Sequence, residues 1–359
     1  MAMTFIFKPT SRCNLRCRYC FAHRNRDEER FMSDSEVLQS IEWAKQYAVL
    51  RKCRHVIWLW HGGEPMLLGA KRLQFLTQMV KAVFEKASIS VVFHLQTNLT
   101  LLNQEWINVF QSDYCNTIGV SLDFQTGARV DATGKLYDDI VLRNILILRE
   151  NNIEVNAISL VTPQNIGQVR EMYDFFKHNE LSFKTARYFP STSPLVGELA
   201  YATTDEAYSD FLCLLYDTWV ADKNPTIRVH NLLEMATGLI NGRRRLCTAE
   251  IGKCYKNYLC LEAGGEIFNC GRYDTPQQRL GTINDSPETI IAIVNHRAET
   301  PLNHECTSCP CLQLCNGGCP FERETSGRYL DCFVTKSVLS HIATHLKKAG
   351  IQIKVDPTL

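Results

Sequence analysis

Three cysteines near the start of the chain have the residue type and the spacing of a metal-binding loop. Cys13, Cys17 and Cys20 form a C-x3-C-x2-C pattern directly after an apolar, strand-like run. A 4Fe-4S cube has four irons, so a loop with three thiolates leaves one iron open to a small chelating ligand. Two simpler explanations compete: zinc held by these cysteines together with His23, or buried cysteines that share one helix face.

The pattern resembles the cluster-binding motif of the radical S-adenosylmethionine (SAM) enzymes, in which an aromatic residue such as Tyr19 precedes the last cysteine. The resemblance implies a 4Fe-4S cluster on Cys13, Cys17 and Cys20. It also implies that S-adenosyl-L-methionine binds the open iron through its amino and carboxylate groups. There it accepts one electron and splits into methionine and a 5'-deoxyadenosyl radical.

Composition limits the class of protein and its compartment. The chain has 359 residues, 45% of them hydrophobic, which is enough to bury a substantial core in more than one domain. A formal charge of +1 gives no footprint for nucleic acid, and no apolar run reaches membrane length. Residues 1–8 have no signal-peptide pattern, so we expect the 16 cysteines to stay reduced in the cytoplasm and to bind metal rather than form disulfides.

The first half of the chain alternates short β-branched or aromatic runs with amphipathic stretches of helical period. Ser33 and Glu36 form a capping-box pattern, and Asn151-Asn152 predicts a helix end. Regular β/α alternation implies parallel strands with right-handed crossovers, so we expect a partial, open (β/α)6 barrel of TIM type. The predicted strands are residues 4–7, 55–60, 90–95, 117–123, 154–160 and 182–187.

Polar motifs follow the first four predicted strands, at the ends that form the active-site face of β/α barrels. Gly62-Gly63-Glu64-Pro65 resembles the GGEP motif of radical SAM enzymes, and Ser121 and Arg143 resemble residues that hold the SAM carboxylate. A plain turn and a surface ion pair are the respective alternatives. Phe124 stands where the family usually has glycine. The SAM-binding residues that the resemblance implies are Gly62, Gly63, Glu64, Gln96, Asn98, Ser121, Asp123 and Arg143.

A second group of cysteines lies in the last third of the chain. Eight of them have an ordered spacing, and eight thiolates suffice for two fully ligated 4Fe-4S clusters. Tyr258 to Cys270 also predicts a hairpin around Ala263-Gly264-Gly265, which would bring Cys260 and Cys270 together. Two structural zinc ribbons are the alternative.

The order G-x4-C, C-x2-C-x5-C-x3-C, C resembles the signature of the SPASM domain of peptide-modifying radical SAM enzymes. The resemblance implies three 4Fe-4S clusters in all, one that binds SAM and two auxiliary ones. Cys247 and Cys311 are extra cysteines that are able to replace an assigned ligand. The inner auxiliary set is Cys254, Cys260, Cys270 and Cys319, and the outer set is Cys306, Cys309, Cys315 and Cys332.

The motifs divide the chain into four segments. These are a radical SAM barrel at residues 1–188, a bridging region at 189–246, a SPASM domain at 247–335, and a C-terminal helix and tail at 336–359. Two further helices are predicted in the bridge, at residues 205–220 and 231–240, and one near the end at 333–348. His341 and His345 share a face of that last helix, but with no partner ligand in sight we expect ordinary core or surface histidines.

The family resemblance implies hydrogen-atom abstraction from a peptide side chain. We expect an oxidative crosslink in a ribosomally made precursor peptide, as a cyclophane carbon-carbon bond, an ether or a thioether. Formylglycine formation and epimerisation are the alternatives. Sulfatase-maturating relatives carry a catalytic aspartate directly after the cysteine that here is Cys270, where this chain has Gly271; Asp274 is a candidate displaced base.

The expected partners are the precursor peptide and a reductant such as flavodoxin or ferredoxin. Because the first strand starts at about Thr4, no N-terminal peptide-recognition domain is expected, which leaves the barrel mouth, the bridge, the SPASM surface or a separate protein to hold the peptide. A non-enzymatic iron-sulfur electron carrier is the remaining alternative. Such a carrier would not cleave SAM and would not need the Gly62-Gly63 loop.

Overall fold

The computed structural model separates into two compact units, which are described one at a time. The first contains residues 1–123, 127–157 and 255–297, and the second contains residues 124–126, 158–254 and 298–359. Within the described part of the chain, no helix is both long and apolar enough to cross a membrane. The structure describes residues 2–20, 30–112, 117–188, 198–223, 225–244, 254–272, 275–299, 301–327 and 329–358.

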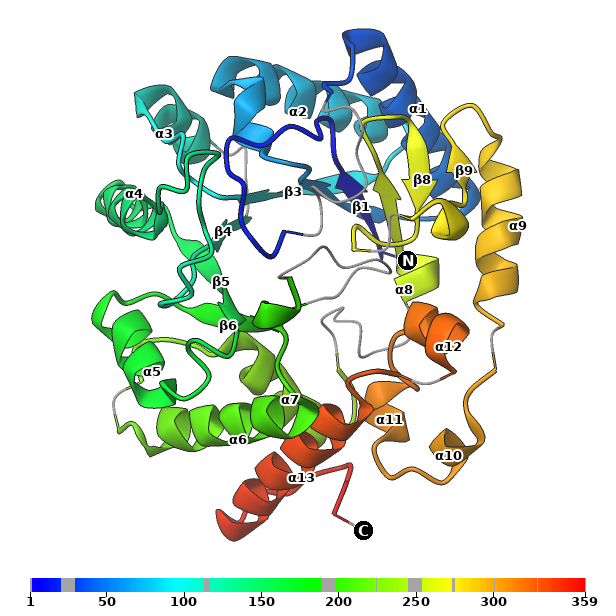
Figure 1. The fold of residues 1–359 in the computed structure, drawn as a ribbon. Helices are drawn as coiled ribbons and strands as arrows, with labels where there is room; N and C mark the ends of the chain where they lie inside the picture. Colours follow the sequence, from blue (N-terminus) through cyan, green and yellow to red (C-terminus); the bar gives the residue numbers. More distant parts are fainter. Residues whose placement is uncertain are drawn as a thin grey trace. The chain divides into compact units, whose positions relative to one another are not determined.

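The predicted β/α alternation is present (Figure 1). Each strand lies within about two residues of its predicted ends. The capping box also forms, with Ser33 and Glu36 bonded reciprocally, and Asn152 has the left-handed conformation (φ 59°) just after α4. The elements in chain order are β1 (Ala2–Phe7), α1 (Asp34–Leu50), β2 (His55–Trp60), η2 (Pro65–Leu68), α2 (Ala70–Glu85), β3 (Ser90–Thr97), α3 (Gln104–Gln111), β4 (Thr117–Ser121), α4 (Asp138–Glu150), β5 (Val155–Val161), α5 (Val169–His178) and β6 (Phe183–Arg187).

In the first unit the strands form a sheet with β1 at its centre. Strands β1 to β4 pair in parallel, and β1 also pairs in parallel with β7 (Tyr258–Leu261) on its other edge. Strands β8 (Glu266–Phe268) and β9 (Gly281–Thr282) continue the sheet in antiparallel pairing, ahead of α9 (Pro287–Arg297). The predicted hairpin is therefore confirmed, and its turn uses Gly265 at φ 77°. The start of the second cysteine region is thus an extension of the barrel sheet.

An aromatic cluster fills the core beneath these strands. Phe5 and Phe7 of β1 pack against Trp58 of β2, with ring centroids 5.8 and 5.0 Å away, and Trp60 lies 5.5 Å from Phe7. All four side chains are fully buried. Large aromatic residues on neighbouring parallel strands bury much apolar area, so this cluster fixes the strand ends that carry the polar motifs.

The second unit is mainly helical. After β6 it contains η3 (Glu198–Tyr201), α6 (Asp205–Ala221) and α7 (His230–Asn241), so both helices predicted in the bridge are confirmed. The predicted C-terminal helix is α13 (Cys332–Lys348); it packs against α6 and α7, and the chain turns at Gly350 with φ 72°. Cysteines of this unit lie on α6 and α13, on α10 (His304–Thr307) and α11 (Leu312–Cys315), at the N-cap of α12 (Pro320–Ser326), and at the first residue of α8 (Cys254–Asn257).

The boundaries of the two units differ from the four segments that the motifs predict. The reason is that β7 to β9, which belong to the predicted SPASM segment, pair with the barrel sheet. The four-segment division remains a proposal about which parts carry the barrel, the bridge and the auxiliary cysteines. Asp274, Cys247 and His23 lie outside the described residues.

A buried ion pair joins β1 to the β7–β8 hairpin. Lys8 Nζ lies 2.5 Å from Glu262 Oε1 and donates to the Gly271 carbonyl oxygen at 2.9 Å. Lys8 is 1% exposed and Glu262 4%. A charge so far from water is tolerated only when it is paired and hydrogen-bonded, so each partner depends on the other.

We therefore predict that Lys8→Met destabilises the protein by about 3–5 kcal/mol, because the buried Glu262 carboxylate loses the ammonium group with which it is paired. The double variant Lys8→Met/Glu262→Leu is expected to recover most of that loss, because neither charge then needs a partner. Denaturant unfolding of the anaerobic, iron-loaded protein measures both.

The matched control is Arg279→Ala, which removes a solvent-exposed pair with Glu266 at 3.2 Å and is expected to cost under about 1 kcal/mol. A Lys8→Met variant no less stable than this control, or a double variant no more stable than Lys8→Met, would contradict the interpretation.

Candidate active site and cluster-binding cysteines

The loop that carries Cys13, Cys17 and Cys20 follows β1 and is not helical, so the explanation by a shared helix face is wrong. Its backbone is fixed from the side, because Arg16 N donates to Val130 O at 2.6 Å and Arg18 N to Ala128 O at 2.9 Å.

The three thiols are close enough to affect one another's ionisation. Burial is the main reason that the pKa values of Cys13 and Cys17 rise to about 12, and the Cys20 thiol raises both further. Thiols gathered in this way need a positive partner to be held as thiolates, and the donor set fits an iron-sulfur cluster.

The glycines after β2 let two loops meet. Gly62 has φ 130°, and a Cβ on Gly63 would lie 2.0 Å from the carbonyl oxygen of Arg12. Gly63 N donates to Thr10 O at 3.0 Å and Glu64 N to Arg12 O at 2.8 Å. The segment is therefore more than a plain turn: its glycines allow close backbone contact with the cysteine loop, in addition to the ligand contact predicted for them.

Glu64 supports this loop, as predicted. Its carboxylate is 1% exposed and accepts from Met66 N at 2.9 Å, from Thr97 Oγ1 at 2.7 Å and from Asn98 N at 2.7 Å. Burial raises the pKa of Glu64, and these three hydrogen bonds oppose the rise. One side chain thereby ties the end of β2 to the end of β3.

Asn98 continues the connection to the cysteines. Its Nδ2 donates to Asn14 Oδ1 at 3.0 Å and lies 3.7 Å from the sulfur of Cys13, which also receives the Leu15 N–H at 3.4 Å. Donors aimed at a cysteine sulfur stabilise the thiolate and tune the potential of a cluster bound to it. Asn98 therefore lies next to the cluster loop, as the motif predicted.

Gln96 and Ser121 meet at the ends of β3 and β4. Gln96 Nε2 donates to Ser121 Oγ at 3.2 Å, and the amide lies across Gly119, where a Cβ would be 2.3 Å from Gln96 Oε1. Because residue 119 is glycine, there is space for the Gln96 side-chain amide. The structure thus brings together two more of the predicted SAM-binding side chains, and their contact with SAM stays a prediction.

Asp123 belongs to a buried network that the sequence did not reveal. The Tyr19 hydroxyl donates to Asp123 Oδ2 at 2.5 Å and accepts from Arg129 at 3.1 Å, and Arg129 Nε lies 3.5 Å from Asp138. Burial and the charge of Asp123 raise the pKa of Asp138 to about 7, against the opposing effect of Arg129. Burial alone would lower the pKa of Arg129, but Tyr19, Cys17 and the two carboxylates raise it.

The surroundings of Arg143 and of Phe124 differ from those that the family resemblance implies. Arg143 is exposed on α4, and within the described residues no hydrogen bond or ion pair involves it, so its contact with SAM also stays a prediction. The buried guanidinium beside the cysteine loop is that of Arg129. In the second unit, Phe124 packs its ring 5.4 Å from that of Phe175, which accounts for a large residue at this position.

The inner auxiliary set is divided between the two units. Cys260 and Cys270 belong to the first unit, where Cys260 pairs across the hairpin with Phe268, two residues before Cys270. The two cysteines are therefore diagonal neighbours rather than directly opposed. Cys254 and Cys319 belong to the second unit, so this ligand set remains a prediction.

The outer auxiliary set surrounds a cavity of about 250 Å³ within the second unit. One water takes about 30 Å³ of liquid, so the cavity has room for a multi-atom group, far more than a single zinc ion occupies. Lys336 lies beside it, and the thiols of Cys309 and Cys332 raise its pKa. Cysteines, room and a nearby cation fit an iron-sulfur cluster. The thiols that line the cavity are those of Cys306, Cys309, Cys311, Cys315 and Cys332.

Comparisons with known proteins agree with this site. Residues 7–176 match the model of the Radical SAM superfamily. Residues 7–176 therefore carry a radical SAM domain, and the fold is the predicted α/β partial barrel; the SPASM assignment of the cysteine-rich C-terminal part stays a prediction.

The particular relatives are maturation enzymes. The chain is 25% identical to the cysteine-type anaerobic sulfatase-maturating enzyme of Clostridium novyi, over 90% of this chain and 89% of the relative. It is 24% identical to the serine-type enzyme of Bacteroides thetaiotaomicron, over 87% of this chain and 80% of the relative.

Two solved structures are similar in fold. The structure of native anSMEcpe with bound AdoMet gives a TM-score of 0.83 at 23% identity, over 97% of this chain and 99% of the other. Streptococcus suis SuiB bound to its precursor peptide SuiA gives 0.63 at 17% identity, over 93% of this chain and 76% of the other.

The contact between the two loops predicts that Gly63→Ala prevents assembly of the first cluster. The new methyl group would lie 2.0 Å from the Arg12 carbonyl oxygen and push the loops apart. We expect about four fewer iron atoms per chain after anaerobic reconstitution, measured against protein concentration. Gly167→Ala is the matched control, since nothing lies within 4 Å of its new methyl group. Equal iron in both variants would refute the prediction.

The cavity predicts which thiols hold the outer cluster. Cys332→Ala is expected to lose about four iron atoms per chain, whereas Cys311→Ala is expected to keep them, because Cys332 belongs to the predicted set and Cys311 is the extra thiol. Iron analysis with electron paramagnetic resonance of the reduced protein measures both, and Cys213→Ala on α6 controls for the loss of an unrelated thiol. The opposite result would exchange the roles of Cys311 and Cys332.

Proposed function

We propose that this radical SAM enzyme acts on a ribosomally made peptide and forms an oxidative crosslink in it. Similarity to sulfatase-maturating enzymes along most of both chains supports a peptide or protein substrate. The fold shared with anSMEcpe and SuiB, which have both been solved with peptides, is compatible with it.

The residues of the first unit would have separate roles in cluster binding and SAM binding. Cys13, Cys17 and Cys20 would hold the cluster, with Asn98 donating to the first sulfur, while Gln96 and Ser121 would face SAM at the strand ends. When bound, the clusters and SAM supply a 5'-deoxyadenosyl radical for hydrogen abstraction and an acceptor for the electron left on the substrate. A crosslink then costs the peptide two hydrogens: one goes to 5'-deoxyadenosine, and the other leaves as a proton and an electron.

The observation that carries the proposal is the backbone at Gly271. The family resemblance implies that sulfatase maturation uses an aspartate directly after the cysteine that here is Cys270, and this chain has Gly271 there. A Cβ on Gly271 would lie 3.3 Å from Lys8 Cε and 3.4 Å from Ile6 Cγ2, and Lys8 bonds the Gly271 carbonyl. The charged group that contacts residue 271 is therefore the Lys8 ammonium, a buried cation paired with Glu262.

Formylglycine formation is the second candidate function, favoured by the sulfatase-maturating relatives. It needs a base other than residue 271, and Asp274 is the candidate within the same segment. Asp274→Asn tests that role: an aldehyde product that disappears in this variant would support it. An electron carrier without catalysis remains the non-enzymatic alternative, and it would make no 5'-deoxyadenosine.

Partners and location follow from the same chemistry. We propose that a low-potential reductant such as flavodoxin or ferredoxin supplies the electron for SAM cleavage, and that the enzyme works in the reducing cytoplasm. A separate recognition protein is the alternative to direct holding of the peptide by the enzyme.

We predict that anaerobic co-expression with a short peptide encoded beside this gene removes two hydrogens from the peptide. One segment should resist fragmentation, and no aldehyde should react with a hydrazide reagent. High-resolution mass spectrometry measures the change, and Cys17→Ala, which lacks a ligand of the first cluster, should leave the peptide unmodified.

A sulfatase-derived peptide with a Cys or Ser at the modified position is the matched substrate control. An aldehyde on either peptide would favour the formylglycine function, and formation of 5'-deoxyadenosine with an unchanged peptide mass would favour epimerisation.

A further inference from the structure

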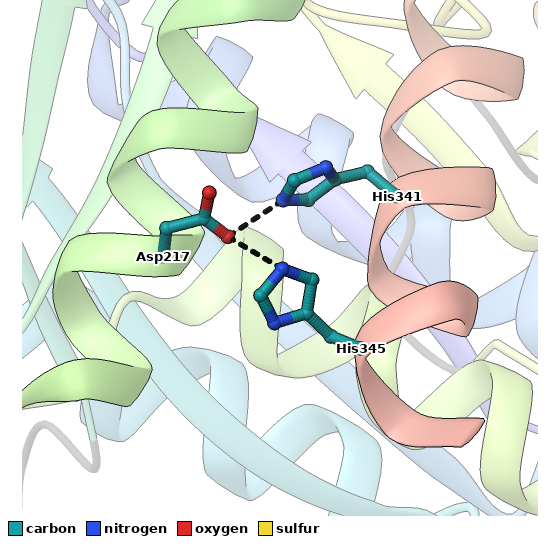
Figure 2. Close-up of side chains that lie close together, drawn as sticks. All are labelled: Asp217, His341 and His345. Atoms are coloured by element: carbon teal, nitrogen blue, oxygen red, sulfur yellow. Dashed lines mark hydrogen bonds and ion pairs between the residues drawn. The ribbon is translucent and has the colours of Figure 1, made fainter. Parts of the chain in front are cut away.

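A cluster of metal-ligating side chains lies in the second unit, apart from the cysteines. Asp217 of α6 and His341 and His345 of α13 point toward one another across the two helices (Figure 2). His341 Nε2 lies 2.6 Å and His345 Nε2 3.1 Å from the same oxygen, Asp217 Oδ1. The three ligand atoms all lie within 4.8 Å of one another.

We propose that Asp217, His341 and His345 bind one divalent transition-metal ion of the zinc class. Two imidazole nitrogens and a carboxylate oxygen are a donor set that Zn²⁺ accepts, at bond lengths of about 2.0–2.2 Å. Ligand atoms of a tetrahedral site are then about 3.3 Å apart, so each imidazole nitrogen would move from Asp217 Oδ1 by a few tenths of an ångström to about 0.7 Å. The two imidazole nitrogens, which lie within 4.8 Å of each other, would adjust toward the same spacing. Three protein ligands leave a position for water or a further donor.

The supporting elements are suited to holding these ligands. His341 and His345 are four residues apart in the middle of a long helix, so their rings share one face at a fixed spacing. The two ring centroids are 4.7 Å apart, and Tyr216 lies edge-on to both, at 6.1 and 5.6 Å. Tyr216 is 4% exposed, so one wall of the site is anchored in the core.

The site is also accessible from solvent, and no lysine or arginine among the described residues competes for its carboxylate. The side chains of Asp217, His341 and His345 are 39%, 28% and 38% exposed, so an ion from solvent has access. Among the described residues no lysine or arginine pairs with Asp217, and Lys347, two residues after His345, is engaged by Asp356 and Thr358 instead. The ion-pair partners of the Asp217 carboxylate are therefore the two imidazoles.

An ion here would clamp α13 to α6, and α13 begins at Cys332, which lines the thiol cavity. The sequence did not predict the site, because Asp217 is separated from His341 by 124 residues. The inference is independent of the reaction that the enzyme catalyses.

The test uses the anaerobically reconstituted holoenzyme, so that the cluster cysteines already hold iron. The protein is incubated with ZnCl₂ and desalted, and zinc and iron are counted per chain. We expect one more zinc in the wild type than in His341→Ala or Asp217→Asn, at equal iron content. X-ray absorption at the zinc edge should show nitrogen or oxygen neighbours at about 2.0 Å, without the sulfur shell at about 2.3 Å that cysteine-bound zinc gives.

Two variants keep the test sharp. Asp217→Asn retains a hydrogen-bond acceptor for the histidines and so tests ligation rather than folding, and His296→Ala, an exposed histidine on α9, is the matched control that should bind as the wild type does. Equal zinc uptake in Asp217→Asn and wild type, a sulfur shell, or no bound zinc would overturn the proposal and leave a metal-free hydrogen-bonded clamp.

Discussion

A single buried carboxylate, that of Glu64, holds the strand ends of the first unit together. It accepts from Met66 in its own loop and from Thr97 and Asn98 after β3. Asn98 in turn reaches the sulfur of Cys13. Because each buried hydrogen-bonding group costs free energy when it loses its partner, these contacts help to fix the cysteine loop in place.

Much of this arrangement is predictable from sequence, because it depends on local patterns. Alternating apolar runs located every strand of the barrel, and the polar motifs at their ends fall on the face that β/α alternation assigns to function. The capping box at Ser33 formed for the same reason, since three residues are enough to define it. Motif spacing likewise placed the cysteines that line the cavity.

The residues that sequence missed are polar groups whose partners lie far along the chain. Lys8 pairs with Glu262, Arg129 with Tyr19, and Asp217 with two histidines. None of these side chains has its partner nearby in the sequence, and only the packing of distant elements buries it or gives it a partner. Arg143 illustrates the reverse, because a charged residue chosen by motif position is exposed.

Generating a radical and directing it place different demands on the protein. The first needs a small fixed set of groups, a three-thiol loop and the strand ends around it, and these follow the family pattern closely. The second depends on what borders the reacting carbon and removes its proton. At Gly271 this chain replaces an acid by bare backbone bonded to the Lys8 ammonium, whose charge is already neutralised by Glu262. The group that contacts residue 271 is thus a cation rather than the carboxylate that the family resemblance implies for sulfatase maturation, and the proposed crosslink rests on this difference.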